Sequence, residues 1–187
     1  MQPKYDGQRM LRRLLTLALS LSLFAPFALT QVTPASANST ILKAAEAGAL
    51  LPPSVFFRGQ SASIQARNSA GIRLSKDALL LAALVDTSGY SSSVQQKYQA
   101  YLITESPVVI GGHRLAPGAY GCGFIANNQF VVMDIGAHDL FMTASTHDAA
   151  LHRPTPLQIL PSPDGHSFRL YEGRSFVEIT VPEASAH

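Results

Sequence analysis

From residue 55 onward, the chain consists of short apolar or alternating runs separated by clusters of Gly, Pro, Asn, Asp and Ser. Such punctuation is typical of β-strands joined by turns, because side chains along a strand alternate between its two faces. Turns are expected at Gly111-Gly112, Asn127-Asn128, Glu172-Gly173 and residues 163–165. Strands are predicted over residues 55–57, 61–67, 71–74, 79–86, 98–104, 108–110, 119–125, 130–135, 140–144, 157–160, 167–171 and 175–181.

The spacing of these strands predicts the fold class. Strand candidates recur about every 8–12 residues without an alternating helix, which favours an antiparallel β-sandwich or barrel over a parallel sheet flanked by helices. Residues 79–86 form a continuous apolar run, which suits a strand buried on both faces. We therefore expect an all-β protein with a single β-rich domain over residues 54–187.

Helical signals are confined to two short segments. Residues 38–53 are expected to form a helix and linker, because Ala and Leu dominate residues 40–51 and Pro52-Pro53 would end a helix. Ser39 or Thr40 is placed to cap that helix. Residues 92–99 leave two alternatives, a helical turn or the start of the following strand.

Residues 1–37 have the pattern of a cleaved export signal. Four basic residues precede a mostly apolar run over residues 14–29, and Ala35-Ser36-Ala37 supplies the small side chains that signal peptidase requires. A membrane-spanning helix needs roughly 20 apolar residues, and this run is shorter and contains Pro26. We expect cleavage between Ala37 and Asn38, a periplasmic or extracellular location, and no membrane span in the mature chain.

Cleavage changes the charge of the protein. The whole chain has 14 basic and 12 acidic residues, of which the leader holds four basic residues and one acidic residue. The mature chain would carry ten basic and eleven acidic residues and no cationic stripe, so nucleic acid is a poor partner. A single Cys excludes an internal disulfide and multi-cysteine metal sites.

One short motif carries a family resemblance. Leu115, Gly118 and Tyr120 form a Leu-x-x-Gly-x-Tyr pattern at the start of a predicted strand, after an apolar strand and a Gly-Gly turn. This resembles secreted bacterial β-sandwich domains of unknown function, and the similarity covers residues 113–135. The resemblance implies export and a β-sandwich fold, and it supplies no catalytic residue.

Cys122 is the first candidate for chemistry. A reactive thiol needs a lowered pKa and a nearby base, and His113 is near enough in sequence to face Cys122 across a hairpin. The competing interpretation is a small buried apolar residue. Gly121 and Gly123 favour the second interpretation, because flanking glycines indicate a close backbone approach or a bulge. We expect Cys122 to be buried and unreactive.

Three histidines form the second candidate. His138, His147 and His152 lie close in sequence to Asp139 and Asp148, and imidazole and carboxylate groups suit zinc, copper or nickel. Their spacing matches no metal motif, and Thr, Ser, Asp and Pro are frequent around them. We therefore expect that the three rings do not converge and that they lie on a surface connection between strands.

A ligand contact is expected at Tyr90, because it lies beside Gly89 and several serines in a predicted loop, where its ring would be exposed. Arg174 is expected to pair with a carboxylate such as Glu172 or Asp134. The chain has no Gly-x-Ser-x-Gly nucleophile motif and no phosphate-loop or dinucleotide fingerprint, so no cofactor is indicated.

Two functions fit these observations. The first is an exported, non-enzymatic β-sandwich that binds an unknown ligand or protein of the cell envelope. The alternative is a small metal-binding protein or metal-dependent enzyme that uses His138, His147 and His152. The first is favoured because the sequence contains no catalytic motif, although a fold class does not define a function.

Overall fold

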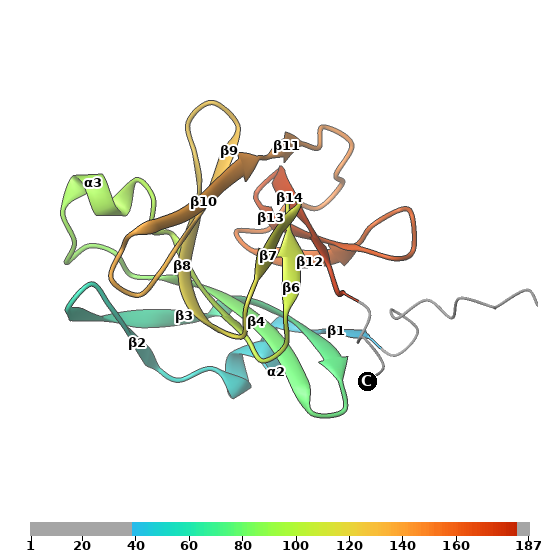
Figure 1. The fold of residues 1–187 in the computed structure, drawn as a ribbon, viewed down its shortest axis with the longest axis horizontal. Coiled ribbons are helices and arrows are strands. Elements are labelled where there is room, and N and C mark those ends of the chain that lie inside the picture. Colours follow the sequence, from blue (N-terminus) through green and yellow to red (C-terminus); the bar gives the residue numbers. More distant parts are fainter. Residues whose placement is uncertain (1–38, 183–187) are drawn as a thin grey trace, which may run out of the picture. The chain divides into compact units, whose positions relative to one another are not determined.

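Two antiparallel β-sheets make up most of the described part of the chain, residues 39–182 of a computed structural model (Figure 1). The strands of the first sheet, in spatial order, are β1 (Thr40–Leu42), β3 (Gln60–Ser75), β4 (Ala78–Val85), β5 (Ala100–Thr104), β8 (Gly118–Ile125), β9 (Gln129–Met133) and β10 (Asp139–Ala144), and β2 (Ser54–Phe57) pairs with β3. Those of the second sheet are β12 (Gln158–Pro161), β13 (Phe168–Glu172), β14 (Ser175–Thr180), β6 (Val108–Ile110) and β7 (His113–Leu115), and β11 (Thr146–His147) pairs with β14. The expected all-β sandwich is confirmed, and the predicted leader lies outside the described residues.

The main hydrophobic core lies between the two sheets. Alternate residues of β4, Leu80 and Ala82, enter this core, whereas Leu81 and Ala83 pack on the opposite face of the sheet with helix α2 (Ala44–Leu50). The continuous apolar run therefore forms a strand buried on both faces, as predicted. From the second sheet, the core receives Ile110, Leu170, Val177 and Ile179.

Helix α2 begins later than the sequence predicts. Residues 40–42 form β1 and pair with residues 71–73 of β3, so the helix starts after Lys43 and not at Thr40. Backbone pairing with β3 outweighs the weak local helix propensity of these three residues. The backbone N–H of Lys43 donates to the Glu46 carboxylate at 2.8 Å, which orders the first turn. The helical alternative for residues 92–99 is correct, because α3 spans Ser92–Gln95.

Strand β3 joins two segments that the sequence analysis separates. Its register with β4 shifts between Ile64 and Ser69, so the intervening residues bulge away from β4. The Ser69 hydroxyl lies 2.8 Å from the carbonyl oxygen of Ala44 and 2.7 Å from that of Ala66, which ties the bulge to α2. Gly48 permits this approach, since a Cβ there would lie 2.6 Å from the Ala66 oxygen.

Two of the predicted turns have the backbone geometry that their residues favour. Gly111 and Gly112 have φ values of 53° and 86°, and they join β6 to β7 with Ile110 paired to His113. Asn127 and Asn128 have φ values of 61° and 53° in the turn between β8 and β9. Asn tolerates this left-handed region better than most residues. These local signals therefore predicted the turns correctly.

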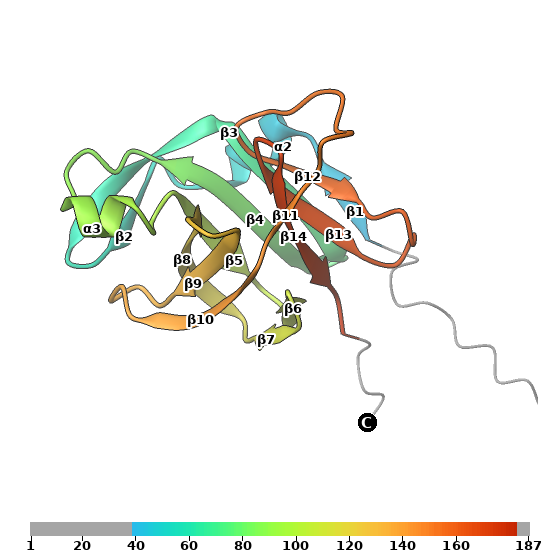
Figure 2. The ribbon, with the colours of Figure 1, turned by 90° about the horizontal axis from the view of Figure 1, so that it is seen from above.

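An aromatic cluster of Phe57, Tyr90 and Tyr98 packs on the outer face of the first sheet, at the end where β2 and α3 lie (Figure 2). The rings of Phe57 and Tyr98 are stacked with centroids 3.8 Å apart, and Tyr90 meets both rings edge-on. A Cβ on Gly121 would overlap the Phe57 ring and lie 3.0 Å from Cδ2 of Tyr98. The glycine beside Cys122 therefore makes room for the stacked rings, which fits the predicted close approach.

All described residues belong to one compact unit, and α2 packs on its β-strands. Within residues 39–182, no helix has the length and apolar character needed to cross a membrane.

Candidate functional site

Tyr90 is not the exposed ring that the sequence predicts. Its side chain is only 6% exposed, and its hydroxyl lies 3.0 Å from the Phe57 carbonyl oxygen and 3.2 Å from that of Gln60. The loop that contains Tyr90 folds over the end of the first sheet, so the ring completes the aromatic cluster. The expectation of exposure was wrong because nothing local in the sequence indicates that β2 supplies a packing partner.

The three histidines do not form a common group. Asp134 accepts hydrogen bonds from the backbone N–H groups of Gly136 and His138, and its Oδ2 lies 2.9 Å from Nδ1 of His138. The hydrogen bonds from His138 lower the pKa of Asp134. His147 lies in β11 opposite Ser175, and His152 lies in the exposed loop that follows.

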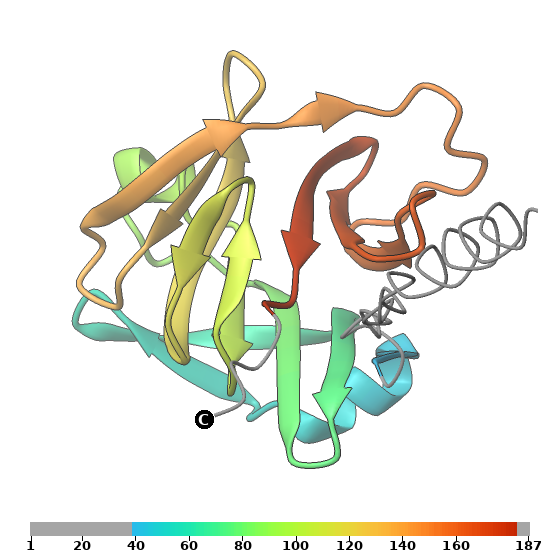
Figure 3. The same ribbon diagram turned by 45° about the vertical axis from the view of Figure 1, so that its right-hand side comes forward.

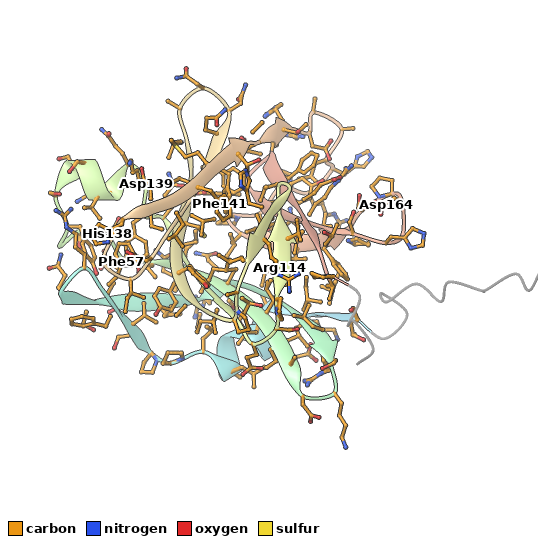
Figure 4. The ribbon with its side chains drawn as sticks, in the orientation of Figure 1. Phe57, Arg114, His138, Asp139, Phe141 and Asp164 are labelled. Atoms are coloured by element: carbon orange, nitrogen blue, oxygen red, sulfur yellow. The ribbon has the colours of Figure 1, made fainter. Side chains whose placement is uncertain are left out.

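Neighbouring acidic groups do not complete a metal site. Asp139 forms an ion pair with Lys97, and both His138 and Asp139 lie at the start of β10, well apart from the β12–β13 turn at Asp164 (Figure 4). In the part of the chain that the structure describes, no three His, Cys, Asp or Glu residues are arranged to hold a metal ion.

Cys122 is buried, as predicted. Its side chain is 1% exposed, between Ala100 of β5 and Val132 of β9, and burial raises the pKa of the thiol. His113 does not serve as its base, because the imidazole stacks on Phe141 with ring centroids 4.6 Å apart. Phe141 comes from β10, and its ring therefore packs against β7, which carries His113.

A pocket of about 480 Å³ opens where the end of β10 and β11 approach β14. It is called the seam pocket below. It combines one basic, one acidic and two hydroxyl side chains with apolar groups from both sheets. Its lining residues are Gly111, Thr143, Ala144, Thr146, Arg169, Phe176, Val177 and Glu178.

The seam pocket exists because two different strands share one edge of β14 (Figure 3). β11 pairs with Ser175 and Phe176 at one end of that edge, and β6 pairs with Ile179 and Thr180 at the other. Val177 and Glu178 lie in the gap between the two pairings. The backbone N–H of Gly111 donates to the Glu178 carbonyl oxygen at 2.9 Å and closes one end of the gap.

Thr143 lines the seam pocket on the side of the first sheet. Its hydroxyl donates to the Gly111 carbonyl oxygen at 3.0 Å, which links β10 to the β6–β7 turn. Glycine is required at position 111, because φ is 53° and a Cβ would overlap the side chain of Thr143. This contact fixes the two sheets against each other beside the pocket.

Arg169 is the principal polar group of the seam pocket. Its guanidinium carbon lies 4.3 Å from the centroid of the Phe176 ring, a cation–π contact that holds the group flat. Its Nε lies 3.5 Å from Oε1 of Glu178, its register partner on β14. This distance is an ion-pair contact and not a hydrogen bond, and the buried Nε has no hydrogen-bond partner among the described residues.

Arg174 holds the loop next to the pocket. Its Nη1 donates to the carbonyl oxygens of Asp148, Ala149 and Leu151 at 3.3, 3.0 and 2.7 Å. The Tyr171 hydroxyl donates to the Asp148 carboxylate at 2.9 Å. The predicted partners of Arg174 were therefore wrong, because the residues after β11 bring backbone carbonyls to it. These bonds fix β11 and the pocket wall that it carries.

Two other hollows lie beside α2 and the β3 bulge. One, of about 510 Å³, is lined mainly by small side chains, including Ala45, Gly48 and Ala49. The second, of about 330 Å³, lies against β12 and residues 155–157. The seam pocket differs from both, because its lining contains a pair of opposite charges, Arg169 and Glu178.

The sequence analysis did not single out the seam pocket residues. A signal was present, since Arg169 and Tyr171 alternate on one predicted strand, and Phe176 and Glu178 alternate on the next. A hairpin between the two strands places all four side chains on one face. The contribution of Thr143 and Thr146 depends on how the sheets meet, which the sequence does not show.

We compared the chain with known protein families, curated proteins and solved structures. No protein-family model matches the chain, and searches of curated proteins and of solved structures found no match.

Proposed function

We propose that this protein is an exported, non-enzymatic binding module of the cell envelope, and that it binds a small polar ligand in the seam pocket. Export is supported by the basic, apolar and small-residue pattern of residues 1–37. The observation that carries the binding proposal is the Arg169 guanidinium, which lines the pocket, is stacked on Phe176 and makes only a long ion pair with Glu178. Ligand sites are typically concave, largely preformed, and equipped with a few well-placed polar groups.

The chemistry of the pocket supports binding in preference to catalysis. Its charged side chains, Arg169 and Glu178, face each other and have no nucleophile between them. The thiol of Cys122 lies in the core, where burial disfavours the reactive thiolate. The metal-site alternative on His138, His147 and His152 has no comparable observation in its favour.

Native mass spectrometry tests this proposal. The exported protein would be incubated with a small-molecule extract of the cell envelope and compared with an Ala144→Tyr variant, which fills the pocket from an exposed position. We expect a small-molecule adduct on the wild-type protein that the variant lacks. An Ala45→Tyr variant fills the hollow beside α2 and should retain the adduct. Absence of any adduct, or equal adducts on all three proteins, would contradict the proposal.

A further inference from the structure

We propose that the ligand of the seam pocket is a free α-amino acid in its zwitterionic form, with a small or medium-sized apolar side chain. This inference rests on the proposed function and names the ligand class of the same pocket. It is based on the incomplete pairing of Arg169 with Glu178 and on the hydroxyl and apolar groups beside them.

Arg169 would bind the carboxylate. A guanidinium offers five N–H donors in a planar fork that matches both oxygens of a carboxylate. The stacking on Phe176 fixes the plane of this fork. The Nε is buried beside Glu178, so a ligand carboxylate would accept hydrogen bonds from the terminal Nη atoms of the guanidinium, whose side chain is 22% exposed.

Glu178 requires the ligand to carry a positive group as well. A second carboxylate on Arg169 would lie close to the carboxylate of Glu178, and like charges at short range repel. An ammonium group on the same ligand removes this repulsion, because Glu178 can turn to accept its hydrogen bonds. The Glu178 side chain is 49% exposed, and its contacts with Arg169 and with the Ser162 hydroxyl, at 3.5 and 3.4 Å, both involve Oε1 and are long.

Thr143 offers a further acceptor for the ammonium group. Its hydroxyl proton is donated to the Gly111 carbonyl oxygen, so the oxygen lone pairs remain for a ligand donor. The pocket therefore presents one cationic donor group and at least two acceptors. In an α-amino acid, the carboxylate and the ammonium lie on the same carbon, which matches this arrangement.

The rest of the lining suits an apolar side chain. Ala144 and the methyl group of Thr143 provide apolar surface, and Arg169 covers one face of the Phe176 ring. Arg169 thus reduces the aromatic surface on which a sugar ring would stack. A volume of about 480 Å³ is ample for an amino acid of the size of valine or leucine.

Methyl NMR titration of the exported protein tests the inference with four probes. L-valine carries both charges, acetate only the anionic group, isobutylamine only the cationic group, and N-acetyl-L-valinamide neither. We expect L-valine to give saturable shifts at the methyl groups of Val177, Thr143 and Ala144. Each of the other probes should bind at least about tenfold more weakly, because it loses one or both charge-assisted contacts.

Two variants separate the roles of the charged residues. Arg169→Lys keeps the positive charge but loses the planar fork, and it should weaken L-valine binding about tenfold or more. Glu178→Gln should weaken L-valine binding by a similar factor and leave acetate binding unchanged or stronger, a split that loss of fold would not produce. Arg73→Lys, an exposed position on β3, is the matched control and should leave both affinities unchanged.

Each outcome supports or overturns the inference. If acetate or N-acetyl-L-valinamide binds as tightly as L-valine, the pocket binds ligands but not amino acids as a class. If no probe shifts the pocket methyl groups while an adduct sensitive to Ala144→Tyr is present, the amino-acid inference fails and the proposed function stands. If the adduct is also missing, both fail. If Arg169→Lys does not fold, the Glu178→Gln variant tests the inference alone. Weaker binding of L-valine together with unchanged or stronger binding of acetate supports the inference, and any other result overturns it.

Discussion

The aromatic cluster and the seam pocket each contain a buried polar atom without a partner, but their surroundings differ. In the cluster, the Tyr98 hydroxyl has no hydrogen-bond partner among the described residues, and its side chain is fully enclosed by packed rings. In the seam pocket, the buried Arg169 Nε lies 3.5 Å from the Glu178 carboxylate, and the guanidinium group to which it belongs lines a hollow. The first group is closed to any ligand, whereas the second belongs to a charged side chain that a ligand can contact.

The aromatic cluster should respond most strongly to loss of a ring. Phe57→Ala should lower the free energy of unfolding by about 3–5 kcal/mol, because it removes a fully buried ring and leaves a cavity. Phe56 is the matched control, since it is the preceding residue, lies on the other face of β2 and is 60% exposed. Phe56→Ala should change the free energy of unfolding by less than about 0.5 kcal/mol. Urea denaturation measures both, and similar losses would show that the cluster is not closely packed.

Overpacking the same region should have the next largest effect. Gly121→Ala adds a Cβ that overlaps the Phe57 ring, and it should lower the free energy of unfolding by about 2–3 kcal/mol. Gly89→Ala is the control, because its Cβ would lie 3.8 Å from its nearest neighbour, Oε1 of Gln60, and it should cost less than about 1 kcal/mol. Chemical denaturation of both variants checks the difference. A well-tolerated Gly121→Ala would mean that the rings can move apart.

The two tyrosines of the cluster should give effects of opposite sign. Tyr98→Phe removes a buried hydroxyl that has no partner and should raise the free energy of unfolding by up to about 1 kcal/mol. Tyr90→Phe removes a hydroxyl that bonds to the Phe57 and Gln60 carbonyl oxygens, and it should lower the same quantity by about 1 kcal/mol. Thermal and urea unfolding of the pair measure the signs. Equal losses in both would indicate that the Tyr98 hydroxyl has a partner in solution.

Glu172 should make stability depend on pH. Burial raises its pKa from 4.5 to about 6, so the folded state binds the proton more tightly than the unfolded state. The stabilising contribution is therefore present below about pH 4.5 and is lost as the pH rises through 6. The full shift corresponds to about 2 kcal/mol, and solvent reaching the half-buried carboxylate reduces this to about 1 kcal/mol.

Glu172→Gln removes this titration. The variant should exceed the wild-type protein in free energy of unfolding by about 1 kcal/mol at pH 7.5. The advantage should disappear at pH 3.5, where the wild-type carboxyl group is mostly protonated in both states. Urea denaturation at the two pH values measures this, and a difference that is the same at both would contradict the assignment.

The smallest stability effect should come from the seam pocket. Glu178→Gln should change the free energy of unfolding by less than about 0.5 kcal/mol, because its ion pair with Arg169 is half exposed and long. Differential scanning calorimetry checks this value beside the binding titrations. A loss comparable with that of Gly121→Ala would mean that the Arg169–Glu178 pair supports the fold and would remove the contrast between the two regions.

The sequence predicted the features that depend on neighbouring residues. The double burial of β4 and the left-handed turns at Gly111-Gly112 and Asn127-Asn128 follow from local side-chain type and backbone freedom. Cys122 was also placed correctly, because its apolar strand context extends over several residues. These features need no knowledge of which strand pairs with which.

The incorrect predictions share a dependence on distant partners. Residues 40–42 form a strand because they pair with β3, and Tyr90 is buried because its ring packs against Phe57. Arg174 donates hydrogen bonds to backbone carbonyl groups of the loop that follows β11. The seam pocket could not be predicted for the same reason, since Thr143 and Glu178 meet only through the packing of two sheets.

The position of β14 also determines the order in which the protein can assemble. Every strand of the first sheet precedes residue 145, so that sheet can begin to pair while the last forty or so residues are still being synthesised. The second sheet joins β6, from the middle of the chain, to β14 near its end, and such long-range pairing forms slowly. The seam pocket is therefore the last part of the molecule to take shape. A chain shortened before Ser175 would retain most of its strands and lack any means of forming the pocket.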